Sequence, residues 1–209
     1  VLVSTDKAVS PTSVMGATKR MAELAIRELG AGEGTHYAAV RFGNVLGSNG
    51  SVIPIFQQQI ESGGPVTVSH PEAERYFMTA HEAAGLILTA AAIGDNQEIY
   101  LLDMGTPVRI DSLARTMIEL SGMVPDKDIV VEYTGLKTGE KLTEILSSEQ
   151  EVLGETANKK LMLVRNTGVG NPTLEQLDDF IASVRNLTDD EVKEGIRRIV
   201  PDYEINGGD

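Results

Sequence analysis

The stretch that decides the fold is the first nineteen residues, Val1-Leu-Val-Ser-Thr-Asp-Lys-Ala-Val-Ser-Pro-Thr-Ser-Val-Met-Gly-Ala-Thr-Lys19. A β-branched apolar run ends at Thr5, Asp6 and Lys7, and a helical pattern follows a serine–proline break. Met15 and Lys19 are four residues apart and share one face of that helix. In open α/β sheets, ligands bind outside the carboxyl ends of the strands, so these residues could form one site. The same residues also fit a polar turn and a solvated helix lysine, because short polar clusters often follow strands.

This segment resembles the active-site segment of extended short-chain dehydrogenases. It is most similar to that of the nucleotide-sugar 4,6-dehydratases of bacterial capsule, O-antigen and protein-glycan biosynthesis. The superfamily signature is Tyr-x-x-x-Lys, and this chain has Met15-Gly-Ala-Thr-Lys19. A membrane-anchored, multi-domain subgroup of these dehydratases resembles the chain in carrying methionine there. The resemblance runs from Val1 to about Leu163.

The resemblance implies the fold class and the domains. We expect an α/β fold with a Rossmann-like, doubly wound parallel sheet and a small α/β substrate-binding lobe, together spanning residues 1–163. A C-terminal helical extension would span residues 164–209. The chain contains no Gly-x-Gly-x-x-Gly segment, which in this family holds the dinucleotide pyrophosphate. We therefore interpret the chain as the C-terminal part of a longer enzyme, unable to bind NAD or NADP fully and inactive when isolated.

Composition and charge narrow the classes of partner. A net charge of −13 argues against binding to nucleic acid or anionic lipid, both of which attract clustered Lys and Arg. The chain has no cysteine, and its three histidines lack paired spacing, so we expect no metal site. No apolar run is long enough to span a bilayer. We expect a cytoplasmic segment without membrane contact. Because the resembled subgroup is membrane-anchored, we expect the parent protein to be anchored on the cytoplasmic face of the inner membrane.

The hydrophobic periodicity predicts the elements of the chain. Helices are expected over 10–30, from the loop after residue 47 to about 63, and over 81–93, 110–121, 174–187 and 189–199. Strands are expected at the start of the chain and over 36–42, 65–68, 98–103 and 130–133, with an edge strand over 159–164. Thr173 and Thr188 are the predicted caps of the last two helices.

Two loops carry the candidate substrate contacts. From the residues alone, a Gly-Ser loop before a helix is either an anion cradle or a simple turn, and Arg75 is either a ligand or a surface arginine. The resemblance implies that the Arg-Phe-Gly-Asn-Val segment at 41–45, the Gly-Ser-Val-Ile-Pro segment at 50–54 and Arg75 line the nucleotide-sugar diphosphate. We therefore expect substrate contacts from Asn44, Ser51, Val52 and Arg75.

The segment Gly135-Leu-Lys-Thr-Gly-Glu-Lys-Leu142 is similar to the family's Gly-Leu-Arg-Pro-Gly-Glu-Lys-Leu loop, whose arginine and acid contact phosphate and ribose. This implies substrate contacts from Lys137 and Glu140. Lysine lacks the planar, bidentate fork of arginine, so the phosphate contact here differs from that of the family.

The resemblance also implies the reaction: dehydration of UDP-N-acetylglucosamine to a UDP-4-keto-6-deoxy sugar. The implied roles are Lys7 as base, Asp6 as acid, Thr5 as donor to the C4 oxygen and Lys19 on the nicotinamide ribose. Further cofactor contacts are expected from Ser4, Phe42 and Asn44. A thioether cannot transfer a proton, so Met15 cannot replace the usual tyrosine in that role.

Two other functions fit the same residues. One is a 4-epimerase of the same superfamily, which typically needs the tyrosine. The other is a non-catalytic module that binds sugar nucleotides. By analogy with the superfamily we expect a homo-oligomer, with the helix after Ser10 as its contact surface.

Overall fold

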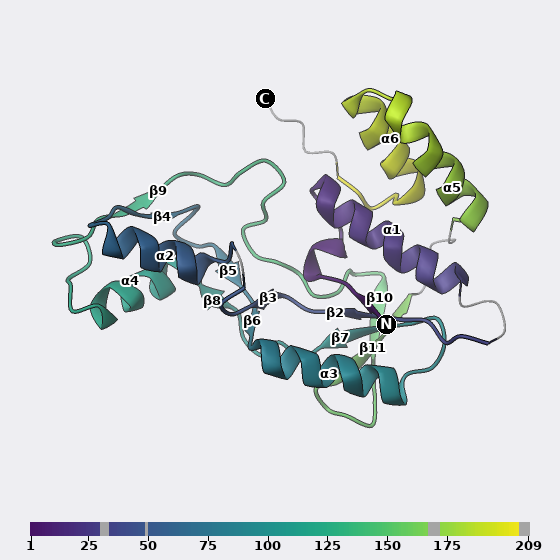
Figure 1. Ribbon diagram of the computed structural model, residues 1–209, viewed down its shortest axis with the longest axis horizontal. Helices are drawn as coiled ribbons and strands as arrows, with labels where there is room; N and C mark the ends of the chain where they lie inside the picture. The colour runs from purple at the N-terminus through teal and green to yellow at the C-terminus, as the bar shows by residue number, and fades with distance from the viewer. Residues whose placement is uncertain (30–33, 49, 167–171, 205–209) are drawn as a thin grey trace. The chain divides into compact units, whose positions relative to one another are not determined.

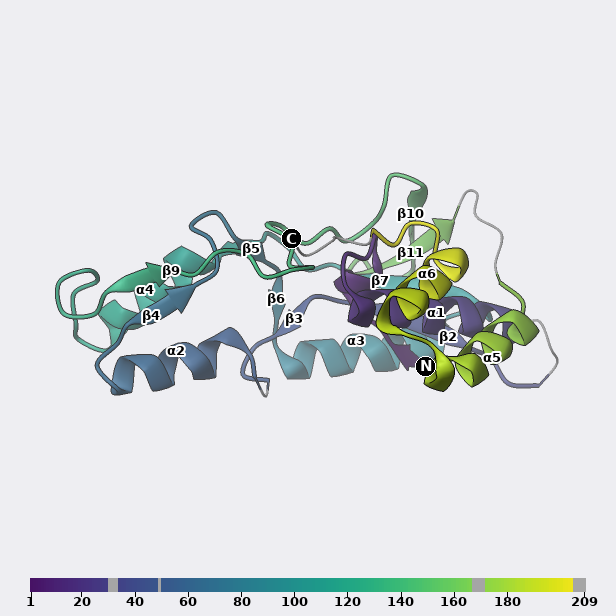
Figure 2. The ribbon, with the colours of Figure 1, turned by 90° about the horizontal axis from the view of Figure 1, so that it is seen from above.

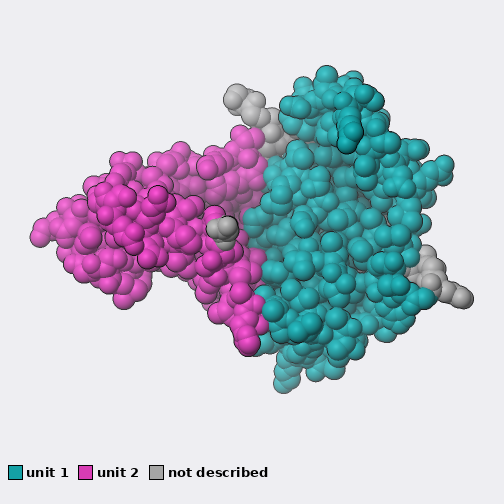
Figure 3. Space-filling view, in the orientation of Figure 1, with its two compact units in different colours: residues 1–42, 83–103, 145–209 teal, residues 43–82, 104–144 magenta. Residues whose placement is uncertain are grey.

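The computed structural model describes residues 1–29, 34–48, 50–166 and 172–204. The chain forms two compact units, which Figure 3 colours separately. Unit 1 comprises residues 1–42, 83–103 and 145–209, and unit 2 comprises residues 43–82 and 104–144. The chain therefore leaves unit 1 and returns to it twice. Each unit has its own hydrophobic core.

Unit 1 is built on a five-stranded sheet with the strand order β1, β2, β7, β11, β10. The strands are β1 (Leu2–Val3), β2 (Ala38–Arg41), β7 (Glu98–Leu102), β11 (Leu161–Asn166) and β10 (Glu151–Glu155). The first three run parallel, whereas β11 is antiparallel to β7 and β10 is antiparallel to β11. All of β2 is buried, as in parallel sheets covered on both faces. The structure confirms the predicted α/β class, with a mixed sheet.

The predicted edge strand at 159–164 is wrong in its position. β11 lies between β7 and β10 and is paired on both sides, so it is an inner strand. The strand at this end of the sheet is β10, which has exposed Val152 and Leu153 and no clear sequence pattern. The expected domain boundary at 163/164 falls inside β11.

Helix α1 (Val14–Leu29) begins four residues later than predicted. Ser10 has a φ of 38°, in the left-handed region, and Pro11 follows it, so the chain turns there instead of starting a helix. The Ser13 hydroxyl then accepts the N–H of Gly16 at 3.2 Å, as an N-cap residue does. The predicted end of this helix at Gly30 lies outside the described residues.

Helix α1 lies on one side of the sheet, and α3 (Ala80–Ile93) lies on the other side (Figures 1 and 2). The helices α5 (Leu174–Ser183) and α6 (Asp189–Ile199) pack on α1, where Met21 and Leu24 meet Leu177 and Ile196 in one buried cluster. A short 3₁₀ turn, η2 (Val184–Asn186), connects α5 with the cap of α6.

The predicted caps of α5 and α6 are confirmed. Thr173 and Thr188 each form a capping box with the residue three positions later. Because α5 and α6 cover the apolar side of α1 within one chain, the structure does not support α1 as the surface that joins two copies.

Unit 2 packs two helices against a pair of parallel strands. The helices are α2 (Val52–Glu61) and α4 (Ile110–Leu120), and the strands are β4 (Val66–Val68) and β9 (Val131–Tyr133). Its core includes Phe56, Ile60, Ile118 and Ile129. Two further strand pairs complete the unit: β3 (Asn44–Val45) with β6 (Phe77–Met78), and β5 (Glu74–Arg75) with β8 (Val108–Arg109). Within the described ranges of both units, no helix has the length and apolar character needed to cross a bilayer.

Candidate active site

Three polar side chains of unit 1 lie together where β1 ends. Residues Asp6–Ala8 form a 3₁₀ turn, η1, and the Thr5 hydroxyl caps it by accepting the N–H of Lys7. The Lys7 Nζ lies 2.9 Å from Oδ1 of Asp6, and the Thr5 hydroxyl donates to the same oxygen at 2.9 Å. The structure thus brings Thr5, Asp6 and Lys7 into one hydrogen-bonded group.

The Asp6 carboxylate is the most buried member of this group. Its side chain is 0% exposed, whereas that of Lys7 is 29% exposed. The second oxygen, Oδ2, has no hydrogen-bond partner among the described residues. A buried carboxylate oxygen without a partner costs free energy, which a hydrogen bond from a ligand would reduce. Oδ2 of Asp6 is therefore a candidate acceptor for a bound hydroxyl.

Helix α1 approaches this group closely at Gly16. A Cβ atom at position 16 would lie 2.2 Å from the carbonyl oxygen of Lys7 and 3.2 Å from the Cβ of Pro11. Only a residue without a side chain allows this approach with the backbone unmoved. Gly16 therefore sets how near α1 comes to η1.

The other predicted residues of unit 1 are also near the end of β1. Lys19 donates from Nζ to the carbonyl oxygen of Val3 at 3.3 Å, which places its ammonium group beside the strand. Met15 is 50% exposed in the first turn of α1. Phe42 is buried just after β2, and its carbonyl oxygen accepts the N–H of Asp6 at 3.1 Å.

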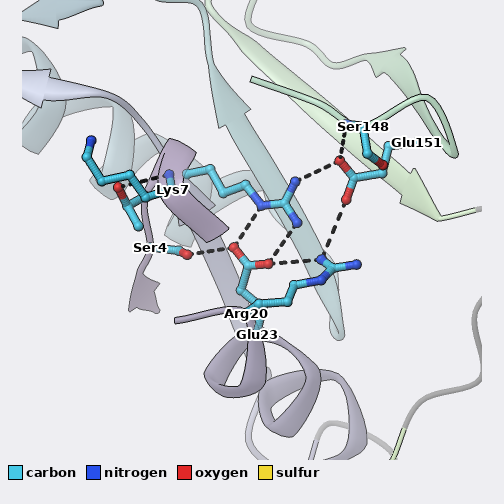
Figure 4. A network of polar contacts seen from close by, with 8 residues as sticks. Ser4, Lys7, Arg20, Glu23, Ser148 and Glu151 are labelled. Carbon is cyan, nitrogen blue, oxygen red and sulfur yellow. Dashed lines mark hydrogen bonds and ion pairs between the residues drawn. The ribbon is translucent and has the colours of Figure 1, made fainter. Parts of the chain in front are cut away.

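Ser4, the remaining predicted residue of unit 1, is turned into the interior. Its hydroxyl donates to Oε1 of Glu23 at 2.6 Å. Glu23 also accepts from Nε and Nη2 of Arg41, both at 2.7 Å, and from Nη1 of Arg20 at 3.0 Å. Glu151 lies 2.9 Å from Arg41 and 3.5 Å from Arg20. Figure 4 shows this group, and we call Arg20, Glu23, Arg41 and Glu151 the buried charge cluster.

The cluster has two positive and two negative side chains, each less than one-tenth exposed. Burial raises the pKa of Glu23, but the charges and hydrogen bonds of Arg41, with smaller contributions from Arg20 and Ser4, outweigh it and hold the pKa below its usual 4.5. Burial lowers the pKa of Arg41, and the hydrogen bonds and charges of Glu23 and Glu151 raise it above its ordinary value. Glu23 and Arg41 are therefore both ionised at neutral pH.

Sequence reasoning missed this cluster. Arg41 belongs to a segment that the resemblance places at the diphosphate, but its guanidinium is fully buried and bound to two carboxylates, so it is not available to a phosphate. The signal was an arginine inside the apolar run Ala38-Ala-Val-Arg-Phe42, because a charge in a buried strand requires a counter-charge.

In unit 2, the structure brings Arg75 and Glu140 together. Nη2 of Arg75 donates to Oε1 of Glu140 at 2.7 Å, and the Ser69 hydroxyl donates to the same oxygen at 2.9 Å. Nη1 of Arg75 also donates to the carbonyl oxygen of Leu142 at 3.0 Å. The backbone N–H of Lys137 donates to Oε2 of Glu140 at 3.2 Å, while the Lys137 side chain is exposed. Glu140 therefore ties the 135–142 loop to Arg75.

Ser51 and Val52 lie at the N-terminus of α2. Ser51 is the N-cap residue, but its side chain makes no capping hydrogen bond. Its hydroxyl oxygen is buried and has no hydrogen-bond partner among the described residues. Val52 is the first residue of the helix, where backbone N–H groups lack partners within the helix. This end of α2 has the donors that an anion requires. Asn44 lies on β3, another element of unit 2.

Known proteins resemble this chain over most of its length. A family described as Polysaccharide biosynthesis protein matches residues 1–166. The chain is 53% identical over 162 residues to the capsular polysaccharide biosynthesis protein CapD of Staphylococcus aureus, covering 77% of this chain and 27% of CapD. It is 49% identical over 181 residues to the probable polysaccharide biosynthesis protein EpsC of Bacillus subtilis, covering 86% of this chain and 30% of EpsC. The chain thus spans less than a third of either relative.

Other matches extend the comparison to related proteins and structures. A UDP-glucose 4-epimerase of Rickettsia canadensis is 30% identical over 208 residues, covering 93% of this chain and 60% of the epimerase. The X-ray structure of Pen from Bacillus thuringiensis matches with a TM-score of 0.68 and 32% identity, covering 89% of this chain and 62% of Pen. DesIV, a dTDP-glucose 4,6-dehydratase from Streptomyces venezuelae with NAD and TYD bound, matches in fold at 20% identity and a TM-score of 0.61, over 70% of this chain and 50% of DesIV. By its sequence matches and its fold, the chain belongs to the polysaccharide biosynthesis protein family, within the extended short-chain dehydrogenase superfamily.

Proposed function

We propose that the chain is the C-terminal part of an NAD- or NADP-dependent nucleotide-sugar 4,6-dehydratase. The proposed reaction converts UDP-N-acetylglucosamine to a UDP-4-keto-6-deoxy sugar for the synthesis of a capsule, an O-antigen or another glycan. The observation that carries this proposal is the buried Asp6 carboxylate, hydrogen-bonded to Lys7 at the carboxyl end of β1.

The pair has the two groups that elimination needs. Loss of water across C5 and C6 requires a base for the C5 proton and an acid for the departing C6 hydroxyl. Moving one proton across the 2.9 Å hydrogen bond from Lys7 to Asp6 gives a neutral amine and a neutral acid. Lys7 then takes the C5 proton, and Asp6 gives its proton to the C6 hydroxyl, which leaves as water. When the hydride returns to C6, Lys7 gives a proton back to C5, and the proton released from the C4 hydroxyl restores the starting Lys7–Asp6 ion pair.

The chain's own residues fit only the nicotinamide end of the cofactor. When bound, NAD or NADP supplies the acceptor for the C4 hydride and returns the hydride to C6. In this proposal Lys19, whose ammonium group lies beside the end of β1, binds the ribose, and Thr5 binds the C4 oxygen. A group other than Met15 must take the C4 hydroxyl proton. Because the sequence has no glycine fingerprint, we propose that the isolated chain does not turn over.

Unit 2 would bind the nucleotide sugar. The buried hydroxyl of Ser51 and the first amides of α2 favour an anion, and Arg75 and Lys137 supply positive charge. In this proposal Glu140 holds Arg75 in place and joins it to the loop that contacts the ribose. We also place Asn44 among the contacts, from the resemblance alone.

The domain, location and assembly of the parent are also proposals. The family match ends at residue 166, where β11 ends, so we propose the domain boundary after residue 166 instead of after residue 163. We propose an active site in the cytoplasm, in a parent anchored on the inner membrane. A homo-oligomer is expected through a surface other than the covered side of α1, and sedimentation of the parent would test it.

A 4-epimerase is the second candidate, favoured by the Rickettsia relative with that name. It would keep the mass of the sugar nucleotide unchanged and would not need the Asp6–Lys7 pair as acid and base. A module that binds the sugar nucleotide without turnover would leave both mass and stereochemistry unchanged.

Mass spectrometry of the full-length protein with UDP-N-acetylglucosamine separates these functions. We expect a product lighter by one water, which Asp6→Asn and Lys7→Ala abolish and the matched control Asp190→Asn on the exposed start of α6 preserves. Binding without a change of mass would contradict the dehydratase. Analysis of the C4 stereochemistry would then distinguish an epimerase from a binding module.

A further inference from the structure

Ser4 and Glu23 connect the buried charge cluster to the proposed catalytic segment. Ser4 directly precedes Thr5, Asp6 and Lys7, and its hydroxyl is held by Glu23 at 2.6 Å. The backbone N–H of Ser4 donates to the carbonyl oxygen of Val40 at 2.7 Å, so both its backbone and its side chain are fixed.

The connection closes into a ring of three elements. Val40 and Phe42 of the β2 segment accept the backbone N–H groups of Ser4 and Asp6, and Arg41 lies between these two acceptors. Arg41 makes two hydrogen bonds to the Glu23 carboxylate on α1, which in turn holds Ser4. The end of β1, the helix α1 and the strand β2 are therefore joined through one carboxylate.

Helix α1 has a second anchor on the same segment. Gly16 allows the helix to touch the carbonyl of Lys7, and Glu23 holds Ser4 about two turns further along. Lys19 lies between the two anchors and reaches the carbonyl of Val3. The position of Lys19 relative to Thr5, Asp6 and Lys7 is thus set from both sides.

Stability alone is a poor explanation for four buried charges. Removing charged groups from water costs so much free energy that apolar side chains of similar volume often stabilise a core equally well or better. Buried ion pairs can instead fix one arrangement of the elements that they join, because each charge accepts only a partner in the correct place. Here the elements so joined are those that carry the proposed catalytic side chains.

We infer that Glu23 is a positioning residue for the proposed dehydration. It acts through Ser4 on the Thr5–Lys7 segment and through α1 on Lys19, without touching substrate or cofactor. The expected effect of Glu23 on turnover rests on the proposed function, whereas its expected effect on the geometry of η1 is independent of that function.

The test uses the full-length protein and three single variants. Ser4→Ala removes the link to the catalytic segment and leaves both arginines on Glu23. Glu23→Gln keeps the shape of the side chain and removes its charge. Glu28→Gln, further along α1 and outside the cluster, is the matched control. The measurements are kcat and KM for UDP-N-acetylglucosamine, the melting temperature, and hydrogen exchange of the Ala8 and Val9 amides, which close η1.

For Ser4→Ala we expect a melting temperature and KM close to those of the parent, a kcat lower by on the order of 10- to 100-fold, and faster exchange at Ala8 and Val9. For Glu23→Gln we expect the same lower kcat with an unchanged KM and the same faster exchange, but also a lower melting temperature. Glu28→Gln should match the parent in all of these measurements. An unchanged kcat in Ser4→Ala, or a kcat that falls only in proportion to the folded fraction, would overturn the inference.

The exchange measurement separates this inference from the proposed function. If the parent does not dehydrate the sugar nucleotide but Ser4→Ala still exchanges faster at Ala8 and Val9, the dehydratase proposal fails and Glu23 still positions η1. If the parent is active and exchange at these amides is the same in all variants, the positioning role fails and the dehydratase proposal stands.

Discussion

Glu23 and Arg41 form two hydrogen bonds of 2.7 Å between side chains that are both fully buried. The two residues lie on different elements, Glu23 on α1 and Arg41 on β2. The pair therefore holds a helix on a strand by charge, at a place where apolar packing would ordinarily do so.

Removal of Glu23 should destabilise the chain strongly. Glu23→Ala leaves the Arg41 guanidinium buried with only Glu151 as counter-charge, and we expect unfolding to become easier by about 3–5 kcal/mol. Urea unfolding monitored by circular dichroism measures this difference. The control is the double variant Glu23→Met with Arg41→Met, which removes both charges and should recover most of the loss; equal losses in the two variants would contradict the explanation.

The same carboxylate predicts a dependence of stability on pH. The pKa of Glu23 is held below its usual 4.5 in the folded chain, so the folded state binds its proton less tightly than the unfolded state. Its contribution to stability is complete above the usual pKa and is lost as the pH falls through the lower, folded-state pKa. The free energy of unfolding should therefore differ between the parent and Glu23→Gln by a constant amount from pH 6 to 7, and the difference should shrink below about pH 4.5. A difference that grows on acidification would contradict this assignment.

Asp6→Asn should separate catalysis from stability. Asparagine keeps the shape of the side chain and can accept from Lys7 and Thr5, but it cannot deliver a proton to a leaving hydroxyl. We expect turnover to fall by roughly 10²- to 10⁴-fold with little change in the melting temperature. Steady-state kinetics and differential scanning calorimetry on the full-length protein measure both. Full activity in this variant would remove Asp6 from the mechanism.

Gly16→Ala should disturb the proposed site through the backbone. The added methyl group would meet the carbonyl oxygen of Lys7, so η1 or the start of α1 must shift. We expect a loss of stability of about 1–3 kcal/mol and a lower kcat, although alanine is the better helix former. Gly85→Ala in α3, where a Cβ has open space, is the matched control and should be neutral or stabilising. Similar behaviour of the two variants would rule out the close approach.

Charge geometry in unit 2 should control binding of the sugar nucleotide. Arg75→Lys loses the fork that contacts Glu140 and the Leu142 carbonyl together, and we expect KM to rise by about tenfold. Lys137→Arg introduces the arginine that the resemblance implies for this loop and should lower KM by a few-fold, with kcat unchanged. Titration calorimetry with UDP checks both directions. A parallel change in the two variants would contradict a role for either side chain in phosphate binding.

Much of the fold follows from local pattern, and the rest follows from contacts across the sequence. Helix α4 and the threonine caps of α5 and α6 could be predicted from the sequence, because each depends on residues only a few positions apart. The start of α1 at Val14 depended on a positive φ at Ser10, which serine rarely adopts. The inner position of β11 depended on its pairing with β10, a strand without a clear pattern.

The candidate site divides in the same way. Asp6 and Lys7 are neighbours in the sequence and follow the end of a predicted strand, so their contact could be predicted from the sequence. The partners of Arg41 are Glu23 and Glu151, and the second of these is 110 positions away. The sequence shows that Arg41 needs a carboxylate, but it does not show which of the many acids of the chain supplies it.

The packing of α5 and α6 on α1 has a consequence during synthesis. Ribosomes release the chain from its N-terminus, so Met21 and Leu24 emerge long before Leu177 and Ile196, which cover them in the finished protein. This apolar side of α1 therefore stays uncovered in the nascent chain while residues 25–176 are translated. Premature termination near residue 170 would leave it uncovered permanently, and we expect such products to be bound by chaperones or degraded.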